Sequence, residues 1–317
     1  MDRRLKHELF RRHLDNPILS VNDWPYDANS VFNAAAAYID HEVVLLVRVE
    51  DFRGFSHFTV ARSKDGVHDW KIDPKPTFVS NSSFPEEIWG IEDPRITWVP
   101  DLQSWAITYT AFSRGGPLVS LATTKDFKTF TRFGSVMTPE DKDAAIFPVR
   151  FGNRWAMLHR PVAKTGGIIS ADIWLSFSPD LKHWGDHQQL IQAREGSWWD
   201  ANKIGLSAPP LETSEGWLIL YHGVRSTASG SIYRLGLALL DLNDPRKVIR
   251  RSDEWVFGPK ASYEREGDVD DVVFSCGWIE KDGIVDMYYG AADSCIALAS
   301  ANLKDLVDYI CKCSVPE

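Results

Sequence analysis

The stretch Glu215-Gly216-Trp217-Leu218-Ile219-Leu220-Tyr221-His222 places a glycine-containing turn directly before an apolar run. A short turn between two apolar segments is the strongest short-range signal for a β-hairpin. The same hairpin pattern occurs four more times along the chain. Its other turns are Asp40-His41-Glu42, Pro100-Asp101, Gly152-Asn153 and Asp282-Gly283.

Each hairpin is followed by another apolar strand and then by a short acidic turn. The aspartates of these turns are Asp65, Asp126, Asp180, Asp244 and Asp305. A repeat of about 60 residues with four short strands per unit is typical of a β-propeller. The sequence therefore predicts an all-β fold, a five-bladed β-propeller that fills residues 1–317 as a single domain. The alternative, an irregular β-sandwich, leaves the recurrence of the turn unexplained.

The first residues of the chain have a different pattern. Leu5, Leu9 and Phe10 share one side of a helix drawn over residues 2–14. We therefore expect a short N-terminal helix, within an extension of residues 1–15, that packs on the propeller or on a partner subunit. A homo-oligomer is consistent with the second possibility.

The composition excludes several classes of protein. A formal net charge of -9 argues against a general nucleic-acid-binding or anionic-membrane surface. No run approaches the length of a membrane-spanning helix, and the N-terminus lacks an apolar signal core. Cys276, Cys295, Cys311 and Cys313 lack zinc-type spacing and are expected to be reduced thiols. We therefore expect a cytoplasmic protein without a metal site.

In a propeller, equivalent positions of successive blades lie on the same face, so the repeat predicts where a binding site lies. The loop before the innermost strand and the loop after the second strand lie on one face of every blade, where binding residues usually gather. The first set of positions holds Asn33, Asp93, Lys142, Asp143, Lys203, Asp270 and Asp271. The second set holds Arg48, Tyr109, His159, Arg160, His222 and Asp293.

Among these residues, Asp93 is the leading candidate for a proton donor. It lies in Gly90-Ile91-Glu92-Asp93-Pro94-Arg95-Ile96, where Pro94 favours an extended conformation for Asp93 at the mouth of a strand. Inverting cleavage of a glycoside needs an acid for the leaving oxygen and a nucleophile on the opposite face of the sugar. Water as the nucleophile also requires a carboxylate base, whereas phosphate requires cations that hold it.

The cationic residues Arg48, Lys142, Arg160 and Lys203, with His159 and His222, favour phosphate in this acidic chain. Each has a purely structural alternative. Arg160 alone is explained by an ion pair with Asp143, His222 by burial against the backbone, and Lys203 by solvent exposure. Their equivalent placement in successive repeats favours a shared role.

The chain resembles the mannoside phosphorylases of glycoside hydrolase family 130 from Val31-Phe32-Asn33 to Gly290-Ala291-Ala292-Asp293. The most specific matching segments are Gly90–Ile96, Phe147-Pro148, Leu158-His159-Arg160-Pro161 and Trp217–Gly223, together with Arg48-Val49-Glu50-Asp51. The resemblance implies a five-bladed propeller that cleaves β-mannosides with phosphate, with inversion, to α-mannose 1-phosphate. No metal or organic cofactor is implied, only inorganic phosphate as co-substrate.

The resemblance also implies roles for residues. Asp93 matches the catalytic acid, whose proton is thought to travel through a hydroxyl of the bound mannose. Lys142, Arg160, Lys203 and His222 match phosphate-binding positions, although Lys142 stands where some members have arginine. Asn33, Arg48 and Asp293 match sugar-contacting positions, and we expect Asp143 and His159 to contact substrate as well.

The expected substrates are β-1,4-linked manno-oligosaccharides or mannosyl-glucose and mannosyl-N-acetylglucosamine. Two rival functions stay open at this point. A β-mannosidase acting on β-1,2 or β-1,4 linkages would use water and a second carboxylate. A non-catalytic propeller would bind glycans without turnover and would not need Asp93.

Overall fold

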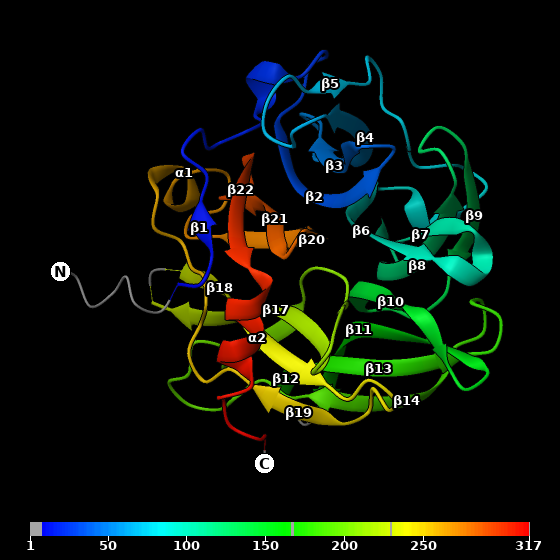
Figure 1. Cartoon of the computed structure of the whole chain (residues 1–317). Coiled ribbons are helices and arrows are strands. Elements are labelled where there is room, and N and C mark those ends of the chain that lie inside the picture. Colours follow the sequence, from blue (N-terminus) through cyan, green and yellow to red (C-terminus); the bar gives the residue numbers. More distant parts are fainter. Residues whose placement is uncertain (1–7, 166–167, 229, 317) are drawn as a thin grey trace.

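Five antiparallel β-sheets surround a central axis in the computed structural model, which describes residues 8–165, 168–228 and 230–316 (Figure 1). Each sheet is one blade, and its main strands follow the chain from the axis outward, except that the N-terminal strand is the outermost strand of the last blade. The prediction of a five-bladed, mostly β propeller is confirmed. Each of the five predicted hairpin turns joins two paired strands.

The strands divide among the blades as follows. Blade 1 contains β2 (Ser30–Ile39), β3 (Glu42–Glu50), β4 (Ser56–Ser63) and β5 (Lys71–Ile72). Blade 2 contains β6 (Ile91–Val99), β7 (Ser104–Ser113), β8 (Gly116–Thr124) and β9 (Phe130–Ser135). Blade 3 contains β10 (Asp141–Phe151), β11 (Arg154–Thr165), β13 (Ile173–Ser178) and β14 (Gly185–Ile191), with β12 (Ile168–Ala171) beside β11. Blade 4 contains β15 (Lys203–Leu206), β17 (Gly216–Thr227), β18 (Gly230–Leu240) and β19 (Val248–Arg251), with β16 (Leu211–Thr213) beside β17. Blade 5 contains β20 (Val273–Lys281), β21 (Ile284–Ala291), β22 (Cys295–Asn302) and β1 (Arg11–Arg12).

Short helices lie between these strands and after the last of them. They are α1 (Ser262–Arg265), α2 (Leu303–Ile310) and the 3₁₀ helices η2 (Val21–Asp23), η3 (Pro85–Glu87) and η4 (Pro100–Leu102). Within the described residues, no helix has the length and apolar character needed to cross a membrane.

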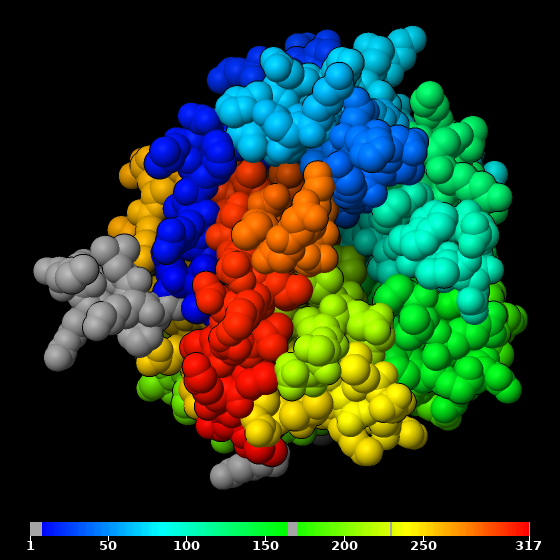
Figure 2. All heavy atoms as spheres, in the orientation of Figure 1, coloured from blue at the N-terminus to red at the C-terminus, as the bar shows by residue number. Residues whose placement is uncertain are grey.

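The N-terminal segment closes the ring. β1 pairs antiparallel with β22, Arg11 opposite Ser300 and Arg12 opposite Ala299, so the start of the chain supplies the outer strand of the last blade. Figure 2 shows this segment lying against the C-terminal blade. The predicted helix over residues 2–14 is therefore wrong for Arg11 and Arg12, and residues 1–7 lie outside the described residues. Pairing with the free edge of β22 satisfies backbone groups that a helix would leave exposed on that edge.

The core lies between adjacent blades. Residues of blades 3 and 4 form one apolar cluster, in which Phe147 and Trp217 meet edge-to-face at 5.2 Å. Because each blade buries both of its faces against neighbours, the inner strands read as nearly continuous apolar runs.

In three blades, the aspartate of the acidic turn stabilises the turn by accepting hydrogen bonds from the backbone. Asp65, Asp126 and Asp180 each accept hydrogen bonds from backbone N–H groups two and three residues further on. These bonds lower the pKa of Asp126 to about 2. In blade 4 Asp241 makes the equivalent bonds instead of Asp244, and Asp305 lies in the first turn of α2.

We predict that ring closure depends on Phe10, which is 2% exposed and lies edge-to-face against Phe257 at 6.2 Å. Phe10→Ala should lower the free energy of unfolding by about 3–5 kcal/mol, the usual effect of truncating a buried ring. Urea unfolding of Phe10→Ala and of Leu14→Ala, whose side chain is 97% exposed, measures the effect. Equal stability of the two variants would contradict this role for the N-terminal segment.

Candidate active site

A cavity of about 190 Å³ lies where the five blades meet. Its wall includes most of the predicted site residues and side chains from every blade. The lining residues are Asn33, Arg48, Asp93, Lys142, Asp143, Arg160, Lys203, His222, Tyr233, Val269, Val272, Phe274 and Asp293. The predicted convergence of polar residues on one end of the channel is therefore present in the structure.

A repeated β-bulge aims three of these side chains at the axis. In blades 1, 2 and 3 the register of the two inner strands shifts by one residue, at Asn33, Asp93 and Asp143. These three residues have φ angles of 46°, 51° and 53°. Asparagine and aspartate tolerate this left-handed conformation better than other non-glycine residues. We expected Asp93 to be extended because Pro94 follows it. Asp93 is instead left-handed, because the bulge determines its backbone conformation.

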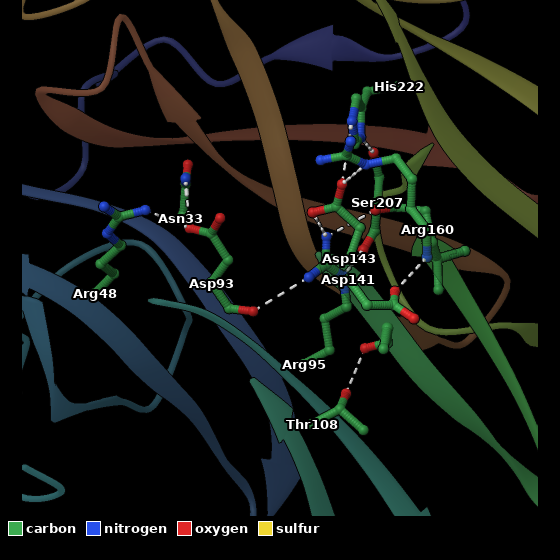
Figure 3. A network of polar contacts seen from close by, with 12 residues as sticks. Asn33, Arg48, Asp93, Arg95, Thr108, Asp141, Asp143, Arg160, Ser207 and His222 are labelled. Atoms are coloured by element: carbon green, nitrogen blue, oxygen red, sulfur yellow. Dashed lines mark hydrogen bonds and ion pairs between the residues drawn. The ribbon is translucent and has the colours of Figure 1, made fainter. Parts of the chain in front are cut away.

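Asp93 lies at the centre of the first of two polar groups. Its Oδ1 atom accepts hydrogen bonds from Asn33 Nδ2 and Arg48 Nη1, each at 2.9 Å (Figure 3). Burial alone would raise the pKa of Asp93, but the charges of Arg48 and Lys142 and the Asn33 hydrogen bond outweigh burial and lower it. Asp93 is therefore ionised at neutral pH when the cavity holds no ligand.

Asp293 has the opposite electrostatic character. Burial and the nearby Asp93 charge raise the pKa of Asp293 to about 6, although Arg48 opposes the shift. Asp93 and Asp293, two of the three carboxyl groups in the cavity wall, therefore titrate in different pH ranges. This arrangement is frequent where acid and base roles are divided.

The second polar group surrounds Asp143. Asp143 Oδ2 accepts a hydrogen bond from Arg160 Nε at 2.6 Å and lies 3.5 Å from His222 Nε2. Burial opposes ionisation, but Arg160, His222, Arg95 and Lys142 hold the pKa of Asp143 well below its usual value. The structural ion pair considered for Arg160 is thus present. Among the described residues, however, nothing accepts a hydrogen bond from Arg160 Nη1 or Nη2, so these atoms are available to a ligand.

Arg95 joins the two groups and was not predicted as a site residue. Its side chain is buried on the axis, donates from Nη1 to the Asp93 carbonyl at 3.1 Å, and donates from Nη2 to Asp143 at 3.3 Å (Figure 3). It also donates to the carbonyls of Leu206 and Ser207 in blade 4. Its place two residues after Asp93, in the same short polar segment, is the sequence signal that could have identified it.

His222 is uncharged at neutral pH, contrary to the cationic role expected for it. Burial is the main cause, and Arg160, Arg95 and Lys203 add to it, so that the pKa of His222 falls to about 3 despite Asp143. The pKa of Lys203 is lowered as well, by burial and then by Arg160. Tyr233, a second residue absent from the prediction, stacks on the His222 ring and lies under Lys203 Nζ.

The segment before Lys203 is anchored by a buried carboxylate. Asp200 accepts hydrogen bonds from Arg194 at 2.9 Å, Arg251 at 2.8 Å and Tyr221 at 3.0 Å. These partners fix the chain three residues before Lys203. Lys203 is therefore held at the cavity wall rather than on a solvated loop.

Several predicted residues do not reach the cavity. His159, expected to contact substrate, has both ring nitrogens occupied, by Asp141 at 2.6 Å and Ser176 at 2.7 Å. Tyr109 donates to Glu87 inside blade 2, and Asp271 lies 3.8 Å from Arg265. These three residues are not among those that line the cavity. Because both ring nitrogens of His159 are already hydrogen-bonded, the structure gives no support for its expected contact with substrate.

Comparison with known proteins gives a consistent result. A protein-family model described as β-1,4-mannooligosaccharide phosphorylase matches residues 6–312. A β-1,2-mannobiose phosphorylase of Listeria innocua is 39% identical over 80% of this chain and 70% of its own. A β-1,4-mannooligosaccharide phosphorylase of Ruminococcus albus is 34% identical over 94% of this chain and 90% of its own. The solved structure of the β-1,2-mannobiose phosphorylase from Listeria innocua, bound to β-1,2-mannobiose, superposes with a TM-score of 0.86 at 31% identity, covering 95% of this chain and 99% of that one.

We predict that two glycines keep the cavity open. A Cβ atom on Gly205 would lie 2.5 Å from Asp143 Oδ2, and one on Gly290 would overlap Asn33 Oδ1. Gly205→Ala and Gly290→Ala should each destabilise the fold by about 1–3 kcal/mol because the wall cannot yield without breaking polar contacts. Gly185→Ala, with nothing within 4 Å of its new atom, is the control in chemical unfolding. If neither variant lost more stability than Gly185→Ala, the cavity wall would be able to accommodate the added methyl group, and the prediction would be contradicted.

We also predict a pH-dependent stability that depends on Asp293. Its pKa is about 6 in the folded protein, above the unfolded value, so the folded state binds this proton more tightly. The stability it contributes is complete below the unfolded pKa and is lost as the pH rises through about 6. The stability of wild type relative to Asp293→Asn should fall by about 2–3 kcal/mol between pH 4 and pH 7. Urea unfolding across this range measures it, with exposed Asp282→Asn as control, and a pH-independent difference would contradict it.

Proposed function

The chain belongs to glycoside hydrolase family 130, the β-mannoside phosphorylases, and from this membership we propose that it cleaves a β-mannoside with inorganic phosphate, with inversion, and releases α-D-mannose 1-phosphate. The enzyme class, a mannoside phosphorylase, is shared with the family.

The observation that carries the proposal is the uneven charge of the cavity wall. On the side of blades 3 and 4, Lys142, Arg160 and Lys203 face the cavity with Asp143 as the accompanying carboxylate. Asp143 is already bound to Arg160 and Arg95. Three cations with a single carboxylate between them leave positive charge that a phosphate dianion can neutralise. Arg160 can bind the phosphate through two parallel N–H groups.

Asp93, Asn33, Arg48 and Asp293 hold the mannose in this proposal. A phosphate oxygen attacks the anomeric carbon from the side of blades 3 and 4 and forms the new C–O bond. The bond to the leaving sugar breaks on the opposite face, as inversion requires. The leaving oxygen takes its proton from Asp93, relayed through a hydroxyl of the mannose.

Phosphate binding also supplies the condition for Asp93 to act as an acid. The positive charge of Lys142 contributes to the lowered pKa of Asp93. A bound phosphate offsets this charge and raises the Asp93 pKa, so nucleophile binding and protonation of the acid are coupled. His222, neutral at the operating pH, acts as a hydrogen-bond partner of the phosphate rather than as a counter-ion.

The cavity wall is less suited to hydrolysis than to phosphorolysis. A water nucleophile needs a base on the side of the sugar opposite the leaving group. The carboxylate on that side, Asp143, has its two oxygens bound to arginines. Asp293, the other candidate, interacts with Arg48 and Asp93 and so belongs to the opposite group.

The substrate is a manno-oligosaccharide in this proposal. A β-1,4 linkage stays a prediction, because relatives of similar identity are named for β-1,2-mannobiose and for β-1,4-mannooligosaccharides. The assay therefore uses both series of disaccharides and oligosaccharides.

We predict that the enzyme releases a sugar phosphate only when phosphate is present, and that Asp93→Asn lowers kcat/KM by a factor of about 100 to 10,000, the contribution of a general acid. Arg160→Ala and Lys203→Ala should raise the KM for phosphate about 10-fold to 100-fold, because each removes a charged hydrogen bond. Proton NMR of the anomeric signal and steady-state kinetics measure these effects.

Lys125→Ala, an exposed lysine in the turn after β8, is the matched control for loss of a positive charge. Free mannose formed at the same rate without phosphate would overturn phosphorolysis in favour of hydrolysis. Turnover by Asp93→Asn close to that of wild type would remove Asp93 from the acid role.

A further inference from the structure

An exposed apolar surface, with three aromatic residues and one isoleucine, lies on the two loops beside Arg48 and Asp93. It consists of Phe52, Phe55, Ile88 and Trp89, which are 76%, 38%, 63% and 40% exposed. We call these four residues the rim platform. Exposed apolar side chains that gather in one place indicate a binding surface, whereas single ones are ordinary.

Two adjacent loops form the rim platform and hold its rings in place. Ser56 and Gly90 make a parallel bridge between the loops, and Gly90 approaches so closely that a Cβ atom there would lie 2.8 Å from the Ser56 backbone. Trp89 donates its backbone N–H to Phe112 and meets that ring at 5.5 Å. Asp51 accepts hydrogen bonds from the N–H groups of Arg53 and Phe55. The rings are therefore presented on an ordered scaffold.

The rim platform is continuous with the cavity. Ser56, at its base, accepts a hydrogen bond from Arg48 Nε at 3.0 Å, and Arg48 binds Asp93 through Nη1. Phe52 follows Arg48 by four residues, and Trp89 precedes Asp93 by four. A ligand that extends from the cavity past Arg48 and Ser56 therefore approaches the two loops that carry these rings.

The geometry of the proposed reaction indicates which ligand binds at the rim platform. Blade 1 lies across the ring from blades 3 and 4, which carry the phosphate cations of the proposed function (Figure 1). Inversion places the leaving sugar on the face opposite the nucleophile. The leaving saccharide therefore points away from blades 3 and 4, towards blade 1, where Ser56 lies beside Gly90 of the loop that enters blade 2. Aromatic rings with one open face suit the apolar face of a sugar ring.

We propose that the rim platform binds the leaving saccharide beyond its first sugar unit and makes the enzyme favour longer β-mannosides. This inference rests on the proposed function. The occupant is a neutral manno-oligosaccharide chain, held by stacking on Trp89 and Phe52 rather than by charge. The rim platform thus determines chain-length preference, while the cavity determines the chemistry.

The test compares kcat/KM at saturating phosphate for the tetrasaccharide and the disaccharide of the linkage that wild type cleaves. Trp89→Ala and Phe52→Ala should lower the ratio of tetrasaccharide to disaccharide about 3-fold to 10-fold, as expected for one aromatic contact. Trp98→Ala is the matched control, because Trp98 is 39% exposed on the same blade at the opposite end of β6. An unchanged ratio in both platform variants would overturn the inference.

Two further outcomes are decisive. If Trp89→Ala converts a dimer or larger assembly into monomers in size-exclusion chromatography and leaves the ratio unchanged, a second copy of the chain covers the rim platform, and the inference fails. If wild type releases no sugar phosphate, the proposed function fails separately. Calorimetric binding of mannotetraose to Asp93→Asn, with and without Trp89→Ala, then still tests the rim platform, and equal affinities would contradict it.

Discussion

The guanidinium of Arg95, buried on the propeller axis, is the interaction on which the site depends. A buried charge is costly unless it is paired and its donors are satisfied. Arg95 meets this condition by binding the Asp93 carbonyl, the Asp143 carboxylate and two carbonyls of blade 4. It thereby fixes blades 2, 3 and 4 relative to one another at the level of the cavity. The two polar groups of the cavity keep their separation because this side chain stands between them.

That separation gives the two carboxylates different uses. Asp143 binds arginines through both oxygens and serves to orient Arg160, whose Nη atoms then face the cavity. Asp93 has one oxygen bound by Asn33 and Arg48. Its other oxygen has no partner among the described residues, which leaves it for a ligand. The same residue type therefore performs a structural role in blade 3 and, in our proposal, a chemical role in blade 2.

Much of the fold was predictable from sequence because each blade repeats a local signal. The hairpin turns at Gly216 and Gly283 need only neighbouring residues to form, and the convergence of Asp93, Arg160 and His222 follows from the repeat. The errors concern properties set by distant residues. The N-terminal segment became a strand because Arg11 pairs with Ser300, almost the full chain away. The neutrality of His222 depends on burial and on arginines from two other blades, which no local pattern reveals.

The central claim is that the cavity is divided into a phosphate side and a sugar side. A crystal structure of Asp93→Asn grown with phosphate and a manno-oligosaccharide tests it most directly. The account predicts a phosphate bound by Arg160, Lys203 and His222, with a mannose ring between it and residue 93. A phosphate bound to Arg48 instead, or a mannose ring lying against Lys203, would contradict the account.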